Sequence, residues 1–222
     1  MGAVCWQGVA DEMPDALAVD YGGVRAPDWY EGVAARVSAQ LDSRPWIAAL
    51  HSGAGGFAPA LAQASCTIAG FVFVDAGLPY PGRSIVEEAP AGFVARLRER
   101  TTDGRLAPWS RWFDEDPLAR LIPNADVRAA LKAAEPRAPF AYLKAVSPAS
   151  DAWERLPAAY LQLSANYEAA AARAEARGWP VRRIRLHHLA MASHPAEVAA
   201  PLAELAQLVA NTQNLLPTAS RK

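Results

Sequence analysis

Residues Trp46 to Gly56 read W-I-A-A-L-H-S-G-A-G-G, which is the pattern of a strand that turns into a helix over a serine. Its apolar part, Ile47 to Leu50, has the length of a buried strand of a parallel sheet. His51 and Ser52 follow, then four small residues, and from Phe57 the pattern is that of a helix. A sharp strand-to-helix turn over Ser52 would expose its hydroxyl next to the free N–H groups of a helix start.

This turn resembles the nucleophile elbow of the α/β-hydrolase superfamily, whose pattern is G-x-S-x-G. The chain has L-H-S-G-A at Leu50 to Ala54, so Ala54 fills the second small position while Leu50 departs from the first. The resemblance implies that Ser52 is a nucleophile. Two alternatives stay open, namely a register that puts Gly53 in the nucleophile's place and a glycine-rich turn without chemistry.

The composition favours a single globular domain. The chain has 222 residues, of which 52% are hydrophobic and 20% charged, so it can bury a substantial core. Its net charge is -1 and it has no basic block, which argues against nucleic acid or a membrane surface as a partner. We expect a cytoplasmic location, because neither a signal peptide nor a membrane-spanning run is apparent. The expected partner is a small-molecule substrate. A homo-oligomer is compatible with the sequence.

The two cysteines, Cys5 and Cys66, occur in unrelated contexts, Cys66 in or just after the helix that follows the elbow. This spacing predicts neither a disulfide framework nor a metal site. We expect no cofactor and no metal.

The N-terminal residues Gly2 to Ala10 resemble the segment that follows the first central strand in α/β-hydrolases. That resemblance implies that the first central strand would precede Met1, so that either the natural chain starts further upstream or the protein lacks the first strands of the usual sheet. The alternative is an ordinary N-terminal helix with no missing partner.

An α/β fold with a mostly parallel sheet flanked by helices is predicted. Asp15 to Tyr21 is a strand candidate, and Asp28 with Glu31 predicts a capping box at the start of the next helix. Ile68 to Val74 is apolar throughout, as a central strand would be. We expect it to lie beside the elbow strand at the centre of the sheet, with Asp75 just beyond its carboxyl end.

Residues 83–157 differ in character from the rest of the chain. They are rich in proline and in short amphipathic helical patterns, such as Gly92 to Arg100 and Ala125 to Ala134, and they show no strand pattern. The segment resembles the helical cap that α/β-hydrolases insert into the core, which would then comprise residues 1–82 and 158–222. Its aromatic residues either line a substrate pocket or form the cap's own core; they are Trp109, Trp112, Phe113, Phe140, Tyr142 and Trp153.

The last part of the chain again has the pattern of alternating strands and helices. We expect strands at 158–164 and 181–186, separated by a helix over 166–177 that Gly178 closes. Pro195 opens the final helix. Its expected buried stripe consists of Val198, Leu202, Leu205 and Leu208.

A serine nucleophile needs a base, and a neutral imidazole is the usual one. In α/β-hydrolases the base follows the last strand, and a proline opens the final helix seven residues later. His188 and Pro195 have this spacing, so the resemblance makes His188 the base. His194 is interpreted as a neighbour of the helix start and His51 as a packing partner under the elbow.

The acid that orients the base is harder to assign. The usual site in the family is the loop after the 158–164 strand, which reads S-A-N-Y-E and holds no Asp. Some relatives carry the acid after the preceding strand, where Asp75 lies. Asp75 is our first candidate and Asn166 the alternative. The Gly53 N–H would serve the oxyanion, with a second donor near Gly2 or outside the given sequence.

These residues imply a cofactor-independent serine hydrolase for a small ester, thioester or amide. Ser52 would attack, His188 would transfer the proton and Asp75 would orient it. A catalytically impaired protein of this fold that binds a small apolar ligand or a partner is the alternative. A lyase or cofactor-free oxygenase that uses His188 as a base is a third hypothesis.

Overall fold

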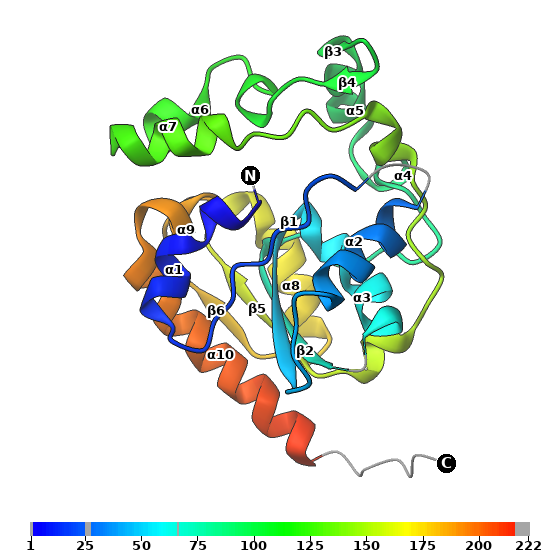
Figure 1. The fold of residues 1–222 in the computed structure, drawn as a ribbon, viewed down its shortest axis with the longest axis vertical. Coiled ribbons are helices and arrows are strands. Elements are labelled where there is room, and N and C mark those ends of the chain that lie inside the picture. The colour runs from blue at the N-terminus through cyan, green and yellow to red at the C-terminus, as the bar shows by residue number, and fades with distance from the viewer. Residues whose placement is uncertain (1, 25–27, 66, 216–222) are drawn as a thin grey trace.

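The computed structural model describes residues 2–24, 28–65 and 67–215, and a parallel sheet lies at its centre (Figure 1). Within the described residues the strand order is β1–β2–β5–β6, with every neighbouring pair parallel. The strands are β1 (Trp46–Ser52), β2 (Ile68–Ala76), β5 (Ala158–Gln162) and β6 (Val181–Arg183). The predicted parallel pairing of the elbow strand with the next strand is confirmed. The expectation that both are central is wrong for β1, which forms an edge of this sheet.

Side chains of β2 alternate between two buried layers, because successive residues of a strand face opposite sides of the sheet. Val72 and Val74 join a cluster with the C-terminal helix, whereas Phe71 and Phe73 join a cluster with the helix after the elbow. All four are fully buried. A strand buried on both faces explains the unbroken apolar run in the sequence.

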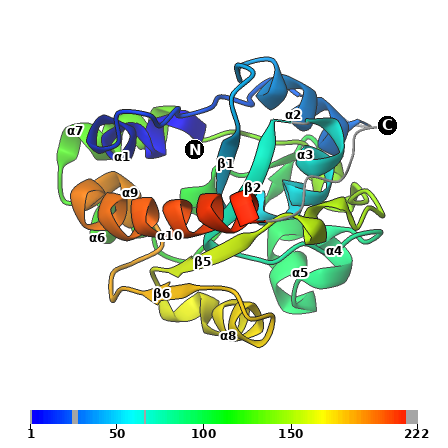
Figure 2. The same cartoon turned by 90° about the horizontal axis from the view of Figure 1, so that it is seen from below.

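Helices cover both faces of the sheet (Figure 2). One face carries α1 (Gln7–Glu12), α9 (Ala190–Ser193) and α10 (Pro195–Leu215). The other carries α2 (Trp29–Ser38), α3 (Ala58–Ala64) and α8 (Glu168–Ala176). Short 3-10 turns connect several of these elements, namely η1 (Gly2–Cys5), η2 (Gly53–Phe57), η5 (Ala152–Arg155) and η6 (Ala165–Tyr167).

The segment predicted to be a cap contributes no strand to the sheet described here, and its green part lies above the sheet in Figure 1. It contains the helices α4 (Ile85–Glu88), α5 (Ala91–Glu99), α6 (Pro117–Leu121) and α7 (Ala125–Ala133). The 3-10 turns η3 (Trp109–Arg111) and η4 (Phe140–Lys144) lie in the same segment. A short antiparallel pair, β3 (Thr101–Thr102) with β4 (Arg105–Leu106), was not expected.

The predicted strand over Asp15 to Tyr21 is wrong, since no described residue there belongs to a strand. A strand needs backbone partners, and no backbone–backbone hydrogen bond joins residues 17–21 to another described residue. Instead, the Gln40 side chain forms hydrogen bonds with the backbone of Asp20 in this segment. Its amide donates to the Asp20 carbonyl at 2.7 Å and accepts from the Asp20 N–H at 3.2 Å.

Two further expectations about helices need correction. Asp28 does precede α2, but its side chain makes no capping hydrogen bond, because its backbone (φ -85°, ψ 48°) is not in the extended conformation of a capping residue. In α10, Val209 rather than Leu208 completes the buried stripe. Leu208 is 38% exposed and Val209 1%, as a period of 3.6 residues counted from Val198 requires.

Cys5 is a free, buried thiol, and Cys66 lies outside the described residues. Among the helices that the structure describes, none combines the length and the apolar character that a membrane crossing requires.

Candidate active site

Ser52 stands at the apex of the turn between β1 and η2, with a left-handed φ of 58°. Such a backbone is strained for a non-glycine residue and persists only when the surroundings hold it. Gly53 begins the 3-10 turn, so the apex falls on Ser52 and not on Gly53 as in the rival register. Leu50, the departure from the elbow pattern, is accommodated because its side chain is buried in the core beside α3.

The small residues after Ser52 are required by close packing at the end of β2. A Cβ on Gly55 would lie 1.9 Å from the Gly77 carbonyl oxygen, and one on Gly56 would lie 2.6 Å from the Tyr80 hydroxyl. Only glycine permits these approaches.

His188 follows β6 and reaches Ser52 from the opposite end of the chain. Its Nε2 lies 3.0 Å from the Ser52 hydroxyl, and its Nδ1 lies 2.8 Å from Oδ2 of Asp75. With its proton on Nδ1, the imidazole donates to Asp75 and accepts from the serine. The structure thus brings together the three residues that were singled out as nucleophile, base and acid.

Asp75 reaches His188 because of a bulge at the end of β2. Val74 pairs with His51 and Ala76 with Ser52, so Asp75 is the extra residue, and its φ is 44°. A bulge turns the side chain of its extra residue out of the regular pattern. The Tyr160 hydroxyl holds this bend, donating to the Ala76 carbonyl at 2.7 Å.

The Asp75 carboxylate is fully buried, yet every contact favours its charged form. It accepts from the backbone N–H of Leu163 at 3.0 Å, from that of Ser164 at 2.9 Å and from the Ser164 hydroxyl at 2.7 Å. Burial alone would raise its pKa, but the hydrogen bonds from His188 and Ser164 outweigh this and hold the pKa of Asp75 below its usual range. Asp75 is therefore ionised at neutral pH.

His51 contacts both the backbone and the ring of His188. Its Nε2 donates to the His188 backbone carbonyl at 2.8 Å, and the two rings are 4.4 Å apart. Desolvation, together with the nearby His188, lowers the pKa of His51 to about 3. His51 is therefore neutral and acts as a packed hydrogen-bond donor, as the sequence suggested.

Two aromatic residues stack on His188, namely Trp109, one of the expected pocket or cap-core aromatics, and Tyr167, which the sequence did not single out. Tyr167 stacks on the His188 ring with centroids 5.1 Å apart and planes 7° apart, and its hydroxyl lies 3.3 Å from that of Ser52. Trp109, from the predicted cap, stacks at 6.3 Å. The sequence signal for Tyr167 is its place in the loop after β5, the usual site of the acid in α/β-hydrolases.

The other candidates lie elsewhere. Asn166 is exposed and its side chain makes no hydrogen bond to another described residue, while Asp75 occupies the position beside Nδ1 of His188. Gly2 faces the Asp20 carboxylate. His187 and His194 share a hydrogen-bonding partner in the Ser193 hydroxyl, at 3.0 and 2.8 Å.

The aromatic residues of the predicted cap serve both expected purposes. Trp112, Phe140 and Tyr142 pack against Leu97 and Leu106 in a small cluster of the segment's own. Trp109, Trp112 and Tyr142 line the cleft that contains Ser52. Trp153 instead belongs to the core under the sheet, 6.3 Å from the ring of Phe73.

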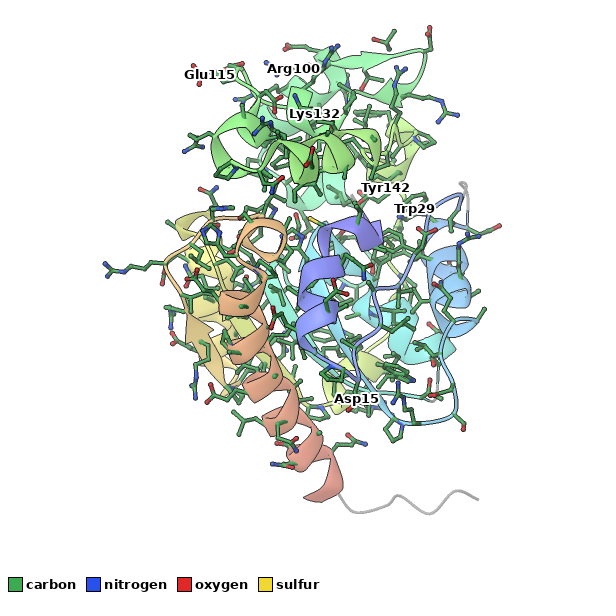
Figure 3. The ribbon with its side chains drawn as sticks, turned by 60° about the vertical axis from the view of Figure 1, so that its left-hand side comes forward. Asp15, Trp29, Arg100, Glu115, Lys132 and Tyr142 are labelled. Atoms are coloured by element: carbon green, nitrogen blue, oxygen red, sulfur yellow. The ribbon has the colours of Figure 1, made fainter. Side chains whose placement is uncertain are left out.

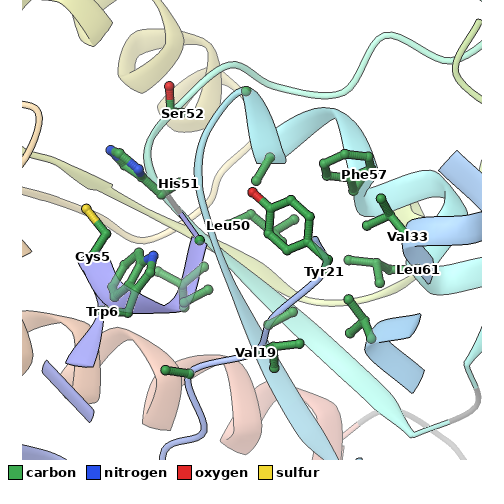
Figure 4. A pocket seen from close by; sticks show the side chains of 18 of the residues that line it. Cys5, Trp6, Val19, Tyr21, Val33, Leu50, His51, Ser52, Phe57 and Leu61 are labelled. Atoms are coloured by element: carbon green, nitrogen blue, oxygen red, sulfur yellow. The ribbon is translucent and has the colours of Figure 1, made fainter. Parts of the chain in front are cut away.

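A cleft of about 1670 Å³ opens around the elbow and extends along β1. Figure 4 shows Ser52 at its upper end above His51, with Trp6 and Cys5 to one side and Tyr21 to the other. In residues 2–24, 28–65 and 67–215, no group of three or more His, Cys, Asp or Glu side chains could hold a metal ion.

No family model matches the sequence, and no curated protein does. Solved structures are similar, however. An extracellular α/β-hydrolase from a Paenibacillus species has a TM-score of 0.70 at 19% identity, covering 93% of this chain and 95% of its own.

Two other similar structures carry different names. A tomato methylketone synthase I variant complexed with β-ketoheptanoate has a TM-score of 0.67 at 16% identity, covering 96% and 93% of the two chains. A pyrethroid hydrolase from Sphingobium faniae has a TM-score of 0.63 at 16% identity, covering 95% and 94%. These similarities show that the chain has the α/β-hydrolase fold.

Proposed function

We propose that this protein is a cofactor-independent serine hydrolase of the esterase type, acting on a small ester, thioester or amide. The observation that carries the proposal is the unbroken hydrogen-bonded chain from Ser52 through His188 to the ionised Asp75. The names of similar folds, which include hydrolases, support it, although a fold does not fix its chemistry.

In this mechanism the Ser52 oxygen attacks the substrate carbonyl while Nε2 of His188 accepts the hydroxyl proton. The imidazolium that forms is stabilised by the Asp75 carboxylate, which keeps its own negative charge. The proton then passes from His188 to the leaving group, and an acyl group remains on Ser52. Water, deprotonated by His188 in turn, releases the acid product.

The carbonyl oxygen becomes an oxyanion during each attack. Gly53 is the first residue of η2, so its N–H has no acceptor within that turn and is available to the oxyanion. The strained backbone of Ser52 keeps the nucleophile and this donor in a fixed relation.

A fluorophosphonate probe tests the proposal, because only an activated serine reacts with it. We expect stoichiometric labelling of the purified protein on Ser52 and hydrolysis of a short-chain p-nitrophenyl ester. Ser52→Ala should abolish both, with loss of turnover by at least about 10⁴-fold. A folded wild-type protein that neither reacts with the probe nor hydrolyses such esters would leave the ligand-binding alternative in its place.

A further inference from the structure

Tyr142, a residue of η4 in the predicted cap, places its hydroxyl over the turn that follows Ser52. The hydroxyl oxygen lies 3.6 Å from the point where a Cβ on Gly53 would stand. Apart from the adjacent residues and the backbone of η2 itself, no other described atom comes within 4 Å of that point. The space above the backbone of Gly53 therefore faces one polar group.

The position of this hydroxyl is fixed by contacts on both sides. The Tyr142 ring packs against Trp29 of α2 with centroids 4.6 Å apart, and Figure 3 labels the two side chains next to each other where the predicted cap meets the sheet layer. Five residues further on, the buried Ser147 hydroxyl donates to the Gly56 carbonyl at 3.5 Å. These contacts tie the segment to the elbow.

The Tyr142 hydroxyl is also available to donate. It makes no hydrogen bond to any residue that the structure describes, whereas the nearby hydroxyls of Tyr30 and Tyr80 bond to each other at 3.1 Å. Burial raises the pKa of Tyr142, and Tyr21 and Tyr30 add to this effect. The hydroxyl therefore keeps its proton at neutral pH.

The distances allow one oxygen to contact both groups. Cβ and N of a residue are about 2.5 Å apart, so the Tyr142 oxygen lies between about 1 and about 6 Å from the Gly53 nitrogen. One oxyanion about 2.9 Å from the nitrogen and about 2.7 Å from the hydroxyl bridges any separation up to about 5.6 Å, which is most of this range. We infer that Tyr142 is a catalytic residue, the second hydrogen-bond donor to the oxyanion formed at Ser52. This inference rests on the proposed function.

In this role Tyr142 transfers no proton. The hydroxyl and the Gly53 N–H stabilise the negative oxygen while the bond from Ser52 to carbon exists. Both hydrogen bonds weaken when the carbonyl re-forms and the leaving group departs with the proton from His188. Because the contact strengthens only in the transition state, it should affect kcat and leave KM unchanged.

The test compares wild type with Tyr142→Phe, which keeps the ring against Trp29 and removes only the hydroxyl. Tyr80→Phe is the matched control, because it also removes a tyrosine hydroxyl near the elbow, one that bonds to Tyr30. With a short-chain p-nitrophenyl ester we expect Tyr142→Phe to lower kcat by about 10²-fold, as loss of one oxyanion donor does, with KM within about twofold. Tyr80→Phe should stay within about twofold in both constants.

Phenylboronic acid gives a second readout, because its adduct with an active serine mimics the tetrahedral intermediate. Its affinity should fall in Tyr142→Phe by a factor similar to the loss in kcat. An active wild type whose Tyr142→Phe variant matches it in kcat and in boronate affinity would overturn the role of Tyr142 and leave the hydrolase proposal intact. A wild type without turnover, probe labelling or boronate binding would overturn both.

Discussion

The two sides of Ser52 are built in different ways. On the side of the base, His188 contacts Asp75, and Asp75 in turn accepts from the loop after β5, so each polar atom has a partner within the sheet layer. On the side of Gly53, the groups nearest to the turn are the Gly53 N–H and the Tyr142 hydroxyl, which comes from the predicted cap.

This difference shows which parts of the site depend on which parts of the fold. The geometry of the base is fixed mainly by strands that pair with each other. Trp109 of the predicted cap also stacks on His188, whereas a change elsewhere in that segment should leave the base unaltered. The surroundings of Gly53 depend on how residues 139–147 sit on the elbow. Variants on the base side should therefore lose proton transfer, and those on the Gly53 side should lose stabilisation of the oxyanion.

The largest effect on the base side is expected for Asp75→Asn. An amide at this place can donate to Nδ1 and favour the wrong tautomer of His188, and it no longer stabilises the imidazolium. We expect kcat for a short-chain p-nitrophenyl ester to fall by about 10⁴-fold, the cost of the equivalent change in serine proteases.

Asn166→Ala is the matched control for this variant, because Asn166 was the alternative orienting residue. Its rate should stay within about twofold of wild type. Circular dichroism would verify that both variants are folded. The reverse order, a slow Asn166→Ala and an unaffected Asp75→Asn, would contradict the assignment of the acid.

A smaller effect is expected at Tyr167, where ring and hydroxyl can be separated. Tyr167→Phe keeps the stack on His188 and removes the contact with Ser52, so kcat/KM should fall by no more than about tenfold, the range of one hydrogen bond. Tyr167→Leu loses the stack as well and should be slower than Tyr167→Phe. Equal rates for the two variants would mean that the ring does not position the base.

The smallest effect is expected for His51 and concerns stability. Its pKa is about 3 in the folded protein and about 6.5 in an unfolded chain, so below pH 6.5 the unfolded state binds a proton that the folded state does not. The free energy of unfolding should therefore fall as the pH is lowered from 7.5 to 5, and the share of this loss due to His51 should be about 2 kcal/mol.

His51→Gln tests this share, because the amide can still donate to the His188 carbonyl but does not titrate. Urea unfolding at pH 7.5, 6 and 5 should give a flatter pH dependence for the variant than for wild type. Parallel curves for the two proteins would show that His51 is not held neutral in the fold.

The strands could be predicted where a run of apolar residues is enough to indicate a strand. The apolar runs that became β2 and β5 are buried, whereas in β1, at the edge of the described sheet, Leu50 is buried and Ala49 is exposed. The spacing of His188 from Pro195 follows from the short path between β6 and α10. The contact of Ser52 with His188 was predicted on this basis and is present. The catalytic roles themselves stay predictions.

The features that the sequence did not predict have a common physical cause. Each depends on a contact with residues far away in the chain, which the local sequence does not reveal. Asp15 to Tyr21 has the composition of a strand, but a strand also needs a neighbour for its backbone, and here a Gln40 side chain supplies the hydrogen bonds. Tyr167 lies 115 positions from Ser52 in the chain, and Tyr142 meets Gly53 only because the predicted cap folds back onto the elbow.

The bulge that carries Asp75 has a consequence for how sequences of this kind can evolve. The loop after β5 serves the acid chiefly through backbone N–H groups, which nearly every amino acid provides, and Ala165 and Asn166 in it are exposed. Mutation can therefore sample these positions freely while Asp75 preserves the orientation of His188. In the proposed mechanism, a carboxylate substituted into this loop would meet a histidine that Asp75 already orients, so a second acid there would add little to the rate.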